Sequence, residues 1–241
     1  MHLIIEPNAA AVASRCAEWM AAAIADDVAE RGRAVVALSG GRTPWLAFTE
    51  LSKCKLPWDA THVAQVDERV VLADDDRRNA KLMRKIFVET AVLPAAHLHE
   101  MPVEATDLDA AATRYGEQLA QLCGGRLWFD LLQLGLGDDG HTASLVPNDP
   151  VLAERERDVV VTGAYFGTRR MTLTYPAINR ARRILWLVTG ANKSAVLTAL
   201  LARGGNTEDY SNMPALGVSR ERATIIADAA AAQDLPADFT A

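Results

Sequence analysis

The feature that most constrains the fold of this sequence is the alternation of short apolar runs with longer helical patterns. The runs are rich in Val, Ile and Leu and read as near-continuous apolar stretches, which is typical of strands buried on both faces. We expect strands at residues 3–5, 34–38, 62–66, 97–101, 131–136, 159–162, 171–175, 184–189 and 223–228.

The segments between these runs carry the signals of helices. Helical patterns cover residues 9–31, 78–90, 106–122 and 191–203. A further helix is expected to begin near Thr43 and Pro44, because proline is favoured in a first turn. The expected ends are Gly32 for the first helix and Gly204-Gly205 for the last, and Thr106 or Asp107 is the expected N-cap of the helix at 106–122.

Alternating strands and helices predict an α/β fold of the doubly wound, Rossmann-like type. Its sheet is expected to be mostly parallel, with helices on both faces. The sequence shows no internal repeat, low-complexity linker or clear boundary, so residues 1–241 are expected to form one domain.

Composition and charge indicate which kinds of partner and which cellular compartment to expect. The net charge of −6 and the pI near 5.4 are opposite to the balance of a domain that tracks nucleic-acid phosphates, so no nucleic-acid partner is expected. Cys16, Cys54 and Cys123 lack ligand-like spacing and are read as reduced thiols. The start MHLIIEPNAA has no cationic region, and no run approaches a membrane span. We therefore expect a cytoplasmic protein without a membrane partner.

Four loops follow predicted strands and carry polar or glycine-rich sequences. In doubly wound sheets, ligands bind outside the carboxyl ends of the strands. This rule selects SGGRTP (39–44), DERVV (67–71), GLGDDGHTAS (135–144) and GANKS (190–194) as loops that should converge.

The first two of these loops have both a functional and a structural interpretation. Gly40 and Gly41 allow close approach of a ligand, and with Ser39 they lead into a helix start that suits an anion, although an ordinary tight turn explains them as well. Asp67 directly follows an apolar run and is expected in the cleft, whereas Glu68 and Arg69 fit a surface pair.

The fourth loop is not a P-loop. That motif needs glycine where Asn192 and Leu187 stand, so a nucleotide site is not predicted. Lys193 can still reach a phosphate as a point charge, or it is a solvated helix lysine. Arg170, in the Arg169-Arg170 pair, is either a bidentate phosphate ligand or one of two surface arginines.

His141 is the strongest candidate for chemistry. An imidazole exchanges protons near physiological pH, and Asp139 stands close enough in sequence to orient it; a purely structural histidine is the alternative. GLGDDG (135–140) matches G-x-G-x-x-G but lacks the first-strand setting of a dinucleotide site. His97 and His99 have no third ligand nearby in sequence, so no metal site is predicted. His2 and His62 are taken as incidental.

In this order, the loops resemble the 6-phosphogluconolactonase family, within the larger group that includes glucosamine-6-phosphate deaminase and ribose-5-phosphate isomerase. LGLGDDGHTASLVP (134–147) is close to the family's LGxGxDGHTASLFP. DER (67–69) with a following asparagine, RMTLTYPAIN (170–179) and GANKSAVL (190–197) also match family segments, so the resemblance covers nearly the whole chain. Arg42, Val71 and Val146 stand where the family commonly has serine, proline and phenylalanine.

The resemblance implies hydrolysis of 6-phosphoglucono-1,5-lactone, a step of the pentose phosphate pathway, with neither a metal nor an organic cofactor. It implies that His141 is the general base, that Asp139 orients the imidazole and that Asp67 lines the sugar end. The residues that it implies for binding substrate and phosphate are Ser39, Gly40, Gly41, Arg69, Asn79, Arg170 and Lys193.

Two other functions stay open from the sequence. A deaminase or isomerase would use Asp67 to abstract a proton, but that family places a glutamate where this chain has Val146. A non-catalytic sugar-phosphate-binding module would keep the anion site without the reaction. The sequence gives no role for Asp138 and does not give the oligomeric state.

Overall fold

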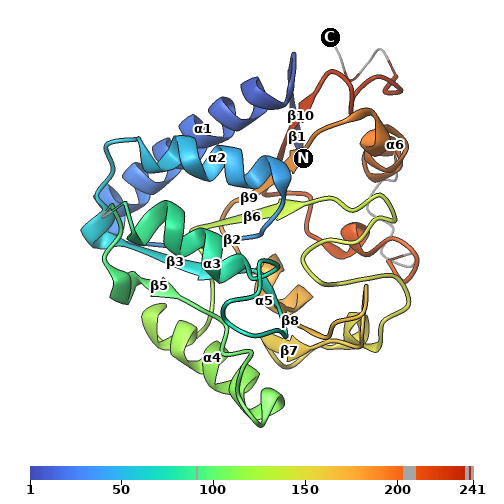
Figure 1. Ribbon diagram of the computed structural model, residues 1–241. Coiled ribbons are helices and arrows are strands. Elements are labelled where there is room, and N and C mark those ends of the chain that lie inside the picture. The colour runs from blue at the N-terminus through green and yellow to red at the C-terminus, as the bar shows by residue number, and fades with distance from the viewer. Residues whose placement is uncertain (91, 203–209, 237–238, 240–241) are drawn as a thin grey trace.

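The main sheet has seven strands, all parallel. The computed structural model describes residues 1–90, 92–202, 210–236 and 239, and their course is shown in Figure 1. The strand order is β1-β10-β9-β6-β2-β3-β5. The strands are β1 (His2–Glu6), β2 (Ala34–Leu38), β3 (Thr61–Gln65), β5 (Leu98–His99), β6 (Leu131–Gly135), β9 (Ile184–Val188) and β10 (Ala223–Asp228).

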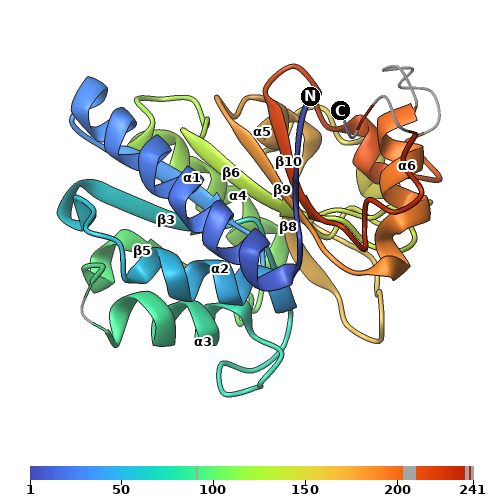
Figure 2. The ribbon, with the colours of Figure 1, turned by 90° about the horizontal axis from the view of Figure 1, so that it is seen from above.

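Helices cover both faces of this sheet, which confirms the predicted doubly wound α/β class. One core lies between the sheet and α1 (Ala9–Arg31), α2 (Arg42–Ser52) and α3 (Asn79–Met83). The other lies between the sheet and α4 (Leu108–Leu122), α5 (Tyr175–Asn179) and α6 (Ser194–Ala202). Figure 2 shows α1 and α2 on one side of β1 and β10 and α6 on the other. Fully burying one Leu, Ile or Val side chain contributes about 1.5–3 kcal/mol to stability, so the two cores hold the helices firmly on both faces of the sheet.

The ends of α1 and α4 follow from local chemistry. The Asn8 side chain accepts a hydrogen bond from the Ala11 amide at 3.0 Å and caps the start of α1. Gly32 ends α1 with φ of +76°, and its amide donates to the carbonyl of Val28. Asp107 caps α4 by accepting from the Ala110 amide at 2.9 Å, which confirms one of the two predicted caps.

A second, antiparallel sheet was not predicted. Its order is β4-β8-β7, with β4 (Asp67–Arg69), β8 (Arg170–Leu173) and β7 (Val159–Val161). The DER segment is therefore a strand, not a loop. The runs at 159–162 and 171–175 do not join the parallel sheet, and their apolar residues alone could not show which sheet they enter.

Several predicted elements differ in extent or type. Tyr175 begins α5 rather than ending a strand, because Pro176 lacks an amide for a ladder and fits a first turn. The helix predicted at 78–90 consists of α3 and a π-helical turn, Arg84–Val88. Short 3-10 turns lie at Trp58–Ala60, Ala95–His97, Pro150–Ala153, Ala191–Lys193 and Pro214–Gly217.

The turn Ala95–His97 leaves only Leu98–His99 of the strand predicted at 97–101. The helix predicted at 191–203 begins as the turn Ala191–Lys193 and continues as α6. Residue 203 and Gly204-Gly205, its predicted stop, lie outside the described residues. The expectation of one domain stays a prediction. In the described part of the chain, no helix has the length and apolar character needed to cross a membrane.

The strand order places the candidate site. From β2 the chain winds outward through β3 and β5, whereas from β6 it winds in the opposite direction through β9 and β10. The sheet therefore reverses between β2 and β6, and in such folds the crevice at the carboxyl ends of these two strands binds ligands. The SGGRTP and GLGDDGHTAS loops begin at this point.

Candidate active site

A cavity of about 580 Å³ lies at the carboxyl ends of the strands. It is lined from the loops after β2, β6 and β9 and from β4 and β8, so the predicted loops converge. Of the predicted site residues, those that line it are Ser39, Gly40, Gly41, Asp67, Arg69, His141, Arg170 and Lys193. Asp139 and Asn79 are not among the lining residues; each lies behind one that is.

His141 is held by Asp139. The Oδ1 atom of Asp139 lies 2.6 Å from Nδ1 of His141 and 3.1 Å from the His141 amide nitrogen. Gly137 is required beside this pair, because a Cβ there would overlap the imidazole and the carboxylate. An ionised Asp139 places the proton on Nδ1, which leaves Nε2 able to accept one.

The carboxyl group of Asp139 is kept ionised by its partners. Burial alone would raise its pKa, but hydrogen bonds from the Tyr165 hydroxyl and the His141 amide bring the pKa below its usual value. The Tyr165 hydroxyl lies 2.8 Å from Oδ2 of Asp139. Both carboxylate oxygens are therefore engaged.

Asp67 is a buried carboxylate at the floor of the cavity. Ser144 donates its hydroxyl to Oδ2 of Asp67 at 2.6 Å, and Ser39 donates to Oδ1 at 3.2 Å. These two hydrogen bonds fix the orientation of the carboxyl group. Asp67 is thus held as an acceptor that faces the substrate space.

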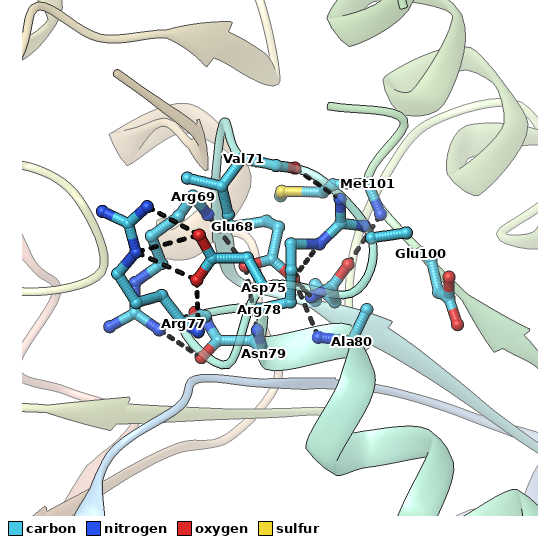
Figure 3. Close-up of polar contacts among 12 residues, drawn as sticks. Glu68, Arg69, Val71, Asp75, Arg77, Arg78, Asn79, Ala80, Glu100 and Met101 are labelled. Atoms are coloured by element: carbon cyan, nitrogen blue, oxygen red, sulfur yellow. Dashed lines mark hydrogen bonds and ion pairs between the residues drawn. The ribbon is translucent and has the colours of Figure 1, made fainter. Parts of the chain in front are cut away.

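Glu68 does not form the surface pair that the sequence suggested. It is 0 % exposed, and its carboxylate accepts hydrogen bonds from the Gln65 side chain and from the amides of Arg69, Asn79 and Ala80, all at 2.8–2.9 Å. Figure 3 shows Arg78 beside this carboxylate, with Nε 3.4 Å from Oε2 of Glu68. Glu68 therefore joins β4 to the start of α3.

Asn79 supports the cavity from behind. Its side-chain amide donates to the carbonyl of Asp67 at 3.0 Å, and its oxygen accepts from Nη1 of Arg69 at 2.6 Å. A Cβ on residue 40 would overlap Asn79 and Trp45, which explains Gly40. The structure thus gives Asn79 a positional contact with Arg69 rather than a place on the cavity wall.

Arg170 presents a cation to the cavity. Its Nε is buried and finds no hydrogen-bond partner among the described residues. Burial lowers the pKa of Arg170, and neighbouring Asp67 opposes this effect. A desolvated guanidinium with free donors is suited to an anion. Arg42 also lines the cavity, at the exposed first residue of α2.

Lys193 is joined to Asp138, a residue whose role the sequence did not indicate. The two side chains form an ion pair, and Asn192 donates to the same carboxylate at 3.0 and 3.1 Å. The lysine pair lowers the pKa of Asp138. Asp138 therefore ties the loop after β9 to the loop after β6.

The sequence missed three residues around the site. Ser144 and Tyr165 contact Asp67 and Asp139, and Asp228 accepts from the Gly190 amide at 3.0 and 3.1 Å. Asp228 ends β10, so the rule about carboxyl ends of strands could have selected it. No local signal marked Tyr165.

Outside the site, His62 joins the two histidines singled out as HxH. Its Nδ1 lies 3.0 Å from Nε2 of His99, and its ring stacks on His97 with centroids 4.2 Å apart. His62 is therefore a packing partner rather than incidental. Within the described ranges, no group of three or more His, Cys, Asp or Glu side chains is arranged to hold a metal ion.

Comparison with known proteins identifies the class. The model of the family described as glucosamine-6-phosphate isomerases/6-phosphogluconolactonase matches residues 7–227. This match covers most of the chain, so the chain belongs to this family.

Relatives refine the position within the family. A 6-phosphogluconolactonase of Synechocystis is 40 % identical over 187 residues, which are 76 % of this chain and 78 % of the relative. The crystal structure of a 6-phosphogluconolactonase from Shewanella baltica has a TM-score of 0.83 at 25 % identity and covers 95 % of this chain and 97 % of that one. A monomeric glucosamine-6-phosphate deaminase has a TM-score of 0.81 at 22 % identity, covers 97 % and 99 % of the two chains, and shows the fold alone.

Proposed function

We propose that this protein hydrolyses 6-phosphoglucono-1,5-lactone to 6-phosphogluconate, a step of the pentose phosphate pathway. The observation that carries the proposal is the pairing of His141 with Asp139 in a cavity that Arg170 also lines. A base and a cation in one cavity match a substrate that has a reactive ester and a phosphate. The similarity to 6-phosphogluconolactonases supports the same reaction.

In the proposed reaction, His141 acts as the general base. Nε2 of His141 takes a proton from water while the water oxygen attacks the lactone carbonyl carbon. The carbon–ring-oxygen bond then breaks, and the same proton returns to the departing ring oxygen. One water is consumed and His141 is regenerated. The lactone is already reactive, so this step calls for neither a metal nor an organic cofactor.

The phosphate is proposed to bind the cations and the glycine loop. Arg170 and Lys193 supply charge, and the amides that follow Ser39, at Gly40 and Gly41, lead into α2. Amides at a helix start attract anions because they lack intrahelical acceptors.

Arg69, held by Asn79, and Asp67 are proposed to contact the sugar part. The three free thiols fit the cytoplasm, which we propose as the compartment, with the small sugar-phosphate lactone as the partner and no nucleic acid.

An assay with freshly prepared lactone tests this proposal. The purified protein should accelerate acid release well above the spontaneous rate, and His141→Ala should remove about 10²–10⁴-fold of that acceleration. His2→Ala, at an exposed residue that begins β1, is the matched control and should keep the full rate.

Three results would contradict the proposal or part of it. No acceleration by the wild-type protein would exclude the function. Full activity of His141→Ala would show that another group is the base. Release of ammonia from glucosamine 6-phosphate would favour the deaminase reaction, which Val146 opposes because it is buried and places no carboxylate near the site.

A further inference from the structure

Tyr165 lies on a hairpin that reaches the active site from the second sheet. The hairpin joins β7 to β8, and its tip is a turn in which Tyr165 and Thr168 pair across Phe166 and Gly167. Phe166 is 80 % exposed and adopts φ of +48° within this tight turn, a conformation that is uncommon for a bulky residue. Phe166 packs on the Tyr165 ring at 4.3 Å between centroids.

The Tyr165 hydroxyl completes a chain of hydrogen bonds to the base. It donates to Oδ2 of Asp139 at 2.8 Å, while Oδ1 of the same carboxylate lies 2.6 Å from Nδ1 of His141. Burial, together with the neighbouring Asp139, raises the pKa of Tyr165 to about 12, so the hydroxyl keeps its proton at physiological pH. Because each oxygen of the Asp139 carboxylate accepts a hydrogen bond, the carboxylate cannot rotate without breaking one of them.

The ring of Tyr165 makes two further contacts with the site. It meets the imidazole of His141 edge to face, with centroids 5.6 Å apart. The guanidinium carbon of Arg170 lies 5.7 Å from the ring centroid, within the range of a cation–π contact. One side chain therefore touches the orienting carboxylate, the base and a cavity cation.

We infer that Tyr165 is a positioning residue for the hydrolytic reaction, acting through Asp139 to hold His141 with Nδ1 protonated and Nε2 directed to water. This inference rests on the proposed function. In the proposed step, the water proton moves to Nε2 of His141 as the bond between the water oxygen and the lactone carbon forms. The proton on Nδ1 of His141 stays there, hydrogen-bonded to Asp139. Tyr165 transfers no proton; its hydroxyl only fixes the acceptor.

Tyr165→Phe isolates the hydroxyl from the ring. This variant keeps the contacts with Phe166 and Arg170 but leaves Oδ2 of Asp139 without its donor. We expect kcat to fall about 10-fold with KM unchanged, as for other residues that orient a functional histidine. The acid limb of the pH profile should move to lower pH, because a carboxylate that is free to rotate lies beside the imidazolium less often and stabilises it less.

Tyr210→Phe is the matched control. It removes a hydroxyl that accepts from Arg155 at 2.7 Å, outside the cavity. It should leave kcat and the pH profile unchanged. Tyr165→Ala should in addition raise KM, because it removes the ring beside Arg170.

A readout without activity separates this inference from the proposed function. Nitrogen NMR of the His141 ring should show one tautomer, with Nδ1 protonated, in the wild-type protein and a mixture in Tyr165→Phe. An unchanged tautomer together with unchanged kcat and pH profile would overturn the positioning role. If the wild-type protein lacks lactonase activity but the tautomer shifts in Tyr165→Phe, the proposed function fails and the positioning of His141 stands.

Discussion

Two carboxylates near the cavity, those of Glu68 and Asp139, are held in opposite ways. Glu68 is fully buried and accepts from four N–H groups, three of them backbone amides. Asp139 is 38 % exposed and is held mainly by two side chains, His141 and Tyr165.

This difference indicates that Glu68 stabilises the fold, whereas Asp139 serves the proposed reaction. The donors to Glu68 belong to the end of β3, to β4 and to the start of α3, so its charge stabilises the fold, and losing it would leave buried donors unpaired. Asp139 lies on a loop and fixes one imidazole, so its charge affects a proton transfer while little of the core depends on it. The cavity thus combines a wall held by the buried Glu68 with a histidine whose orientation depends on Asp139.

Glu68→Gln should give the largest effect and should act on stability. The amide cannot accept from all the buried N–H groups, and Arg78 loses its carboxylate. We expect the free energy of unfolding to fall by about 3–5 kcal/mol, measured by urea denaturation. Glu104→Gln, on the exposed side of the same Arg78, is the control and should cost less than about 1 kcal/mol. Equal losses would remove the distinction between the two kinds of carboxylate.

Asp139→Asn should act on rate and not on stability. An amide at this position no longer fixes the proton on Nδ1 of His141, so we expect lactone hydrolysis to slow about 10²-fold. The melting temperature should stay within about 2 °C of the wild type. Asp26→Asn, on the exposed face of α1, should change neither quantity. A large loss of stability in Asp139→Asn would show that this carboxylate also holds the fold.

Arg170→Gln sharpens the contrast by testing the cation that lies beside the Tyr165 ring. Loss of the charged donors should raise KM for the phosphorylated lactone about 30-fold, while kcat/KM for the unphosphorylated lactone stays unchanged. The neighbouring, exposed Arg169→Gln should have little effect on either substrate. If Arg170→Gln affects both lactones equally, Arg170 does not bind the phosphate.

The smallest effect is expected outside the site, at the histidine cluster. Burial, with His97, His99 and Arg33 nearby, lowers the pKa of His62 to about 4, below its unfolded value of 6.5. The unfolded chain therefore binds more protons than the folded chain between about pH 6.5 and 4, and stability falls as the pH falls through this range. Between pH 7 and 5 this shift corresponds to about 2 kcal/mol, and because the His62 ring is partly exposed, solvent screening reduces the expected cost to about 1 kcal/mol, or 2–4 °C in melting temperature. His62→Phe should lose less over the same range; an equal loss would assign the effect to other groups.

The site could be predicted in part from the sequence. The loops after β2, β6 and β9 were found because apolar runs mark strands and parallel strands present their carboxyl ends at one edge. Ser39, Gly40, Gly41, His141 and Lys193 line the cavity for this reason, whereas Asp67, Arg69 and Arg170 reach it from β4 and β8. Glu68 was misjudged, because three adjacent charges look solvent-exposed until the chain at α3 folds back over them. The partner of Asp138, Lys193, lies on the loop after β9, so only the folded structure shows this ion pair.

By itself, the sequence determined the alternation of strands and helices, the end of α1 at Gly32, and the start of α4 at Thr106 or Asp107. These depend on neighbours a few residues away. Only the tertiary structure decided the order of the strands, the pairing of DER with β8, and the contact of Tyr165 with Asp139, which is 26 residues distant in the chain. Such contacts depend on how separate elements pack, and no local propensity specifies that geometry.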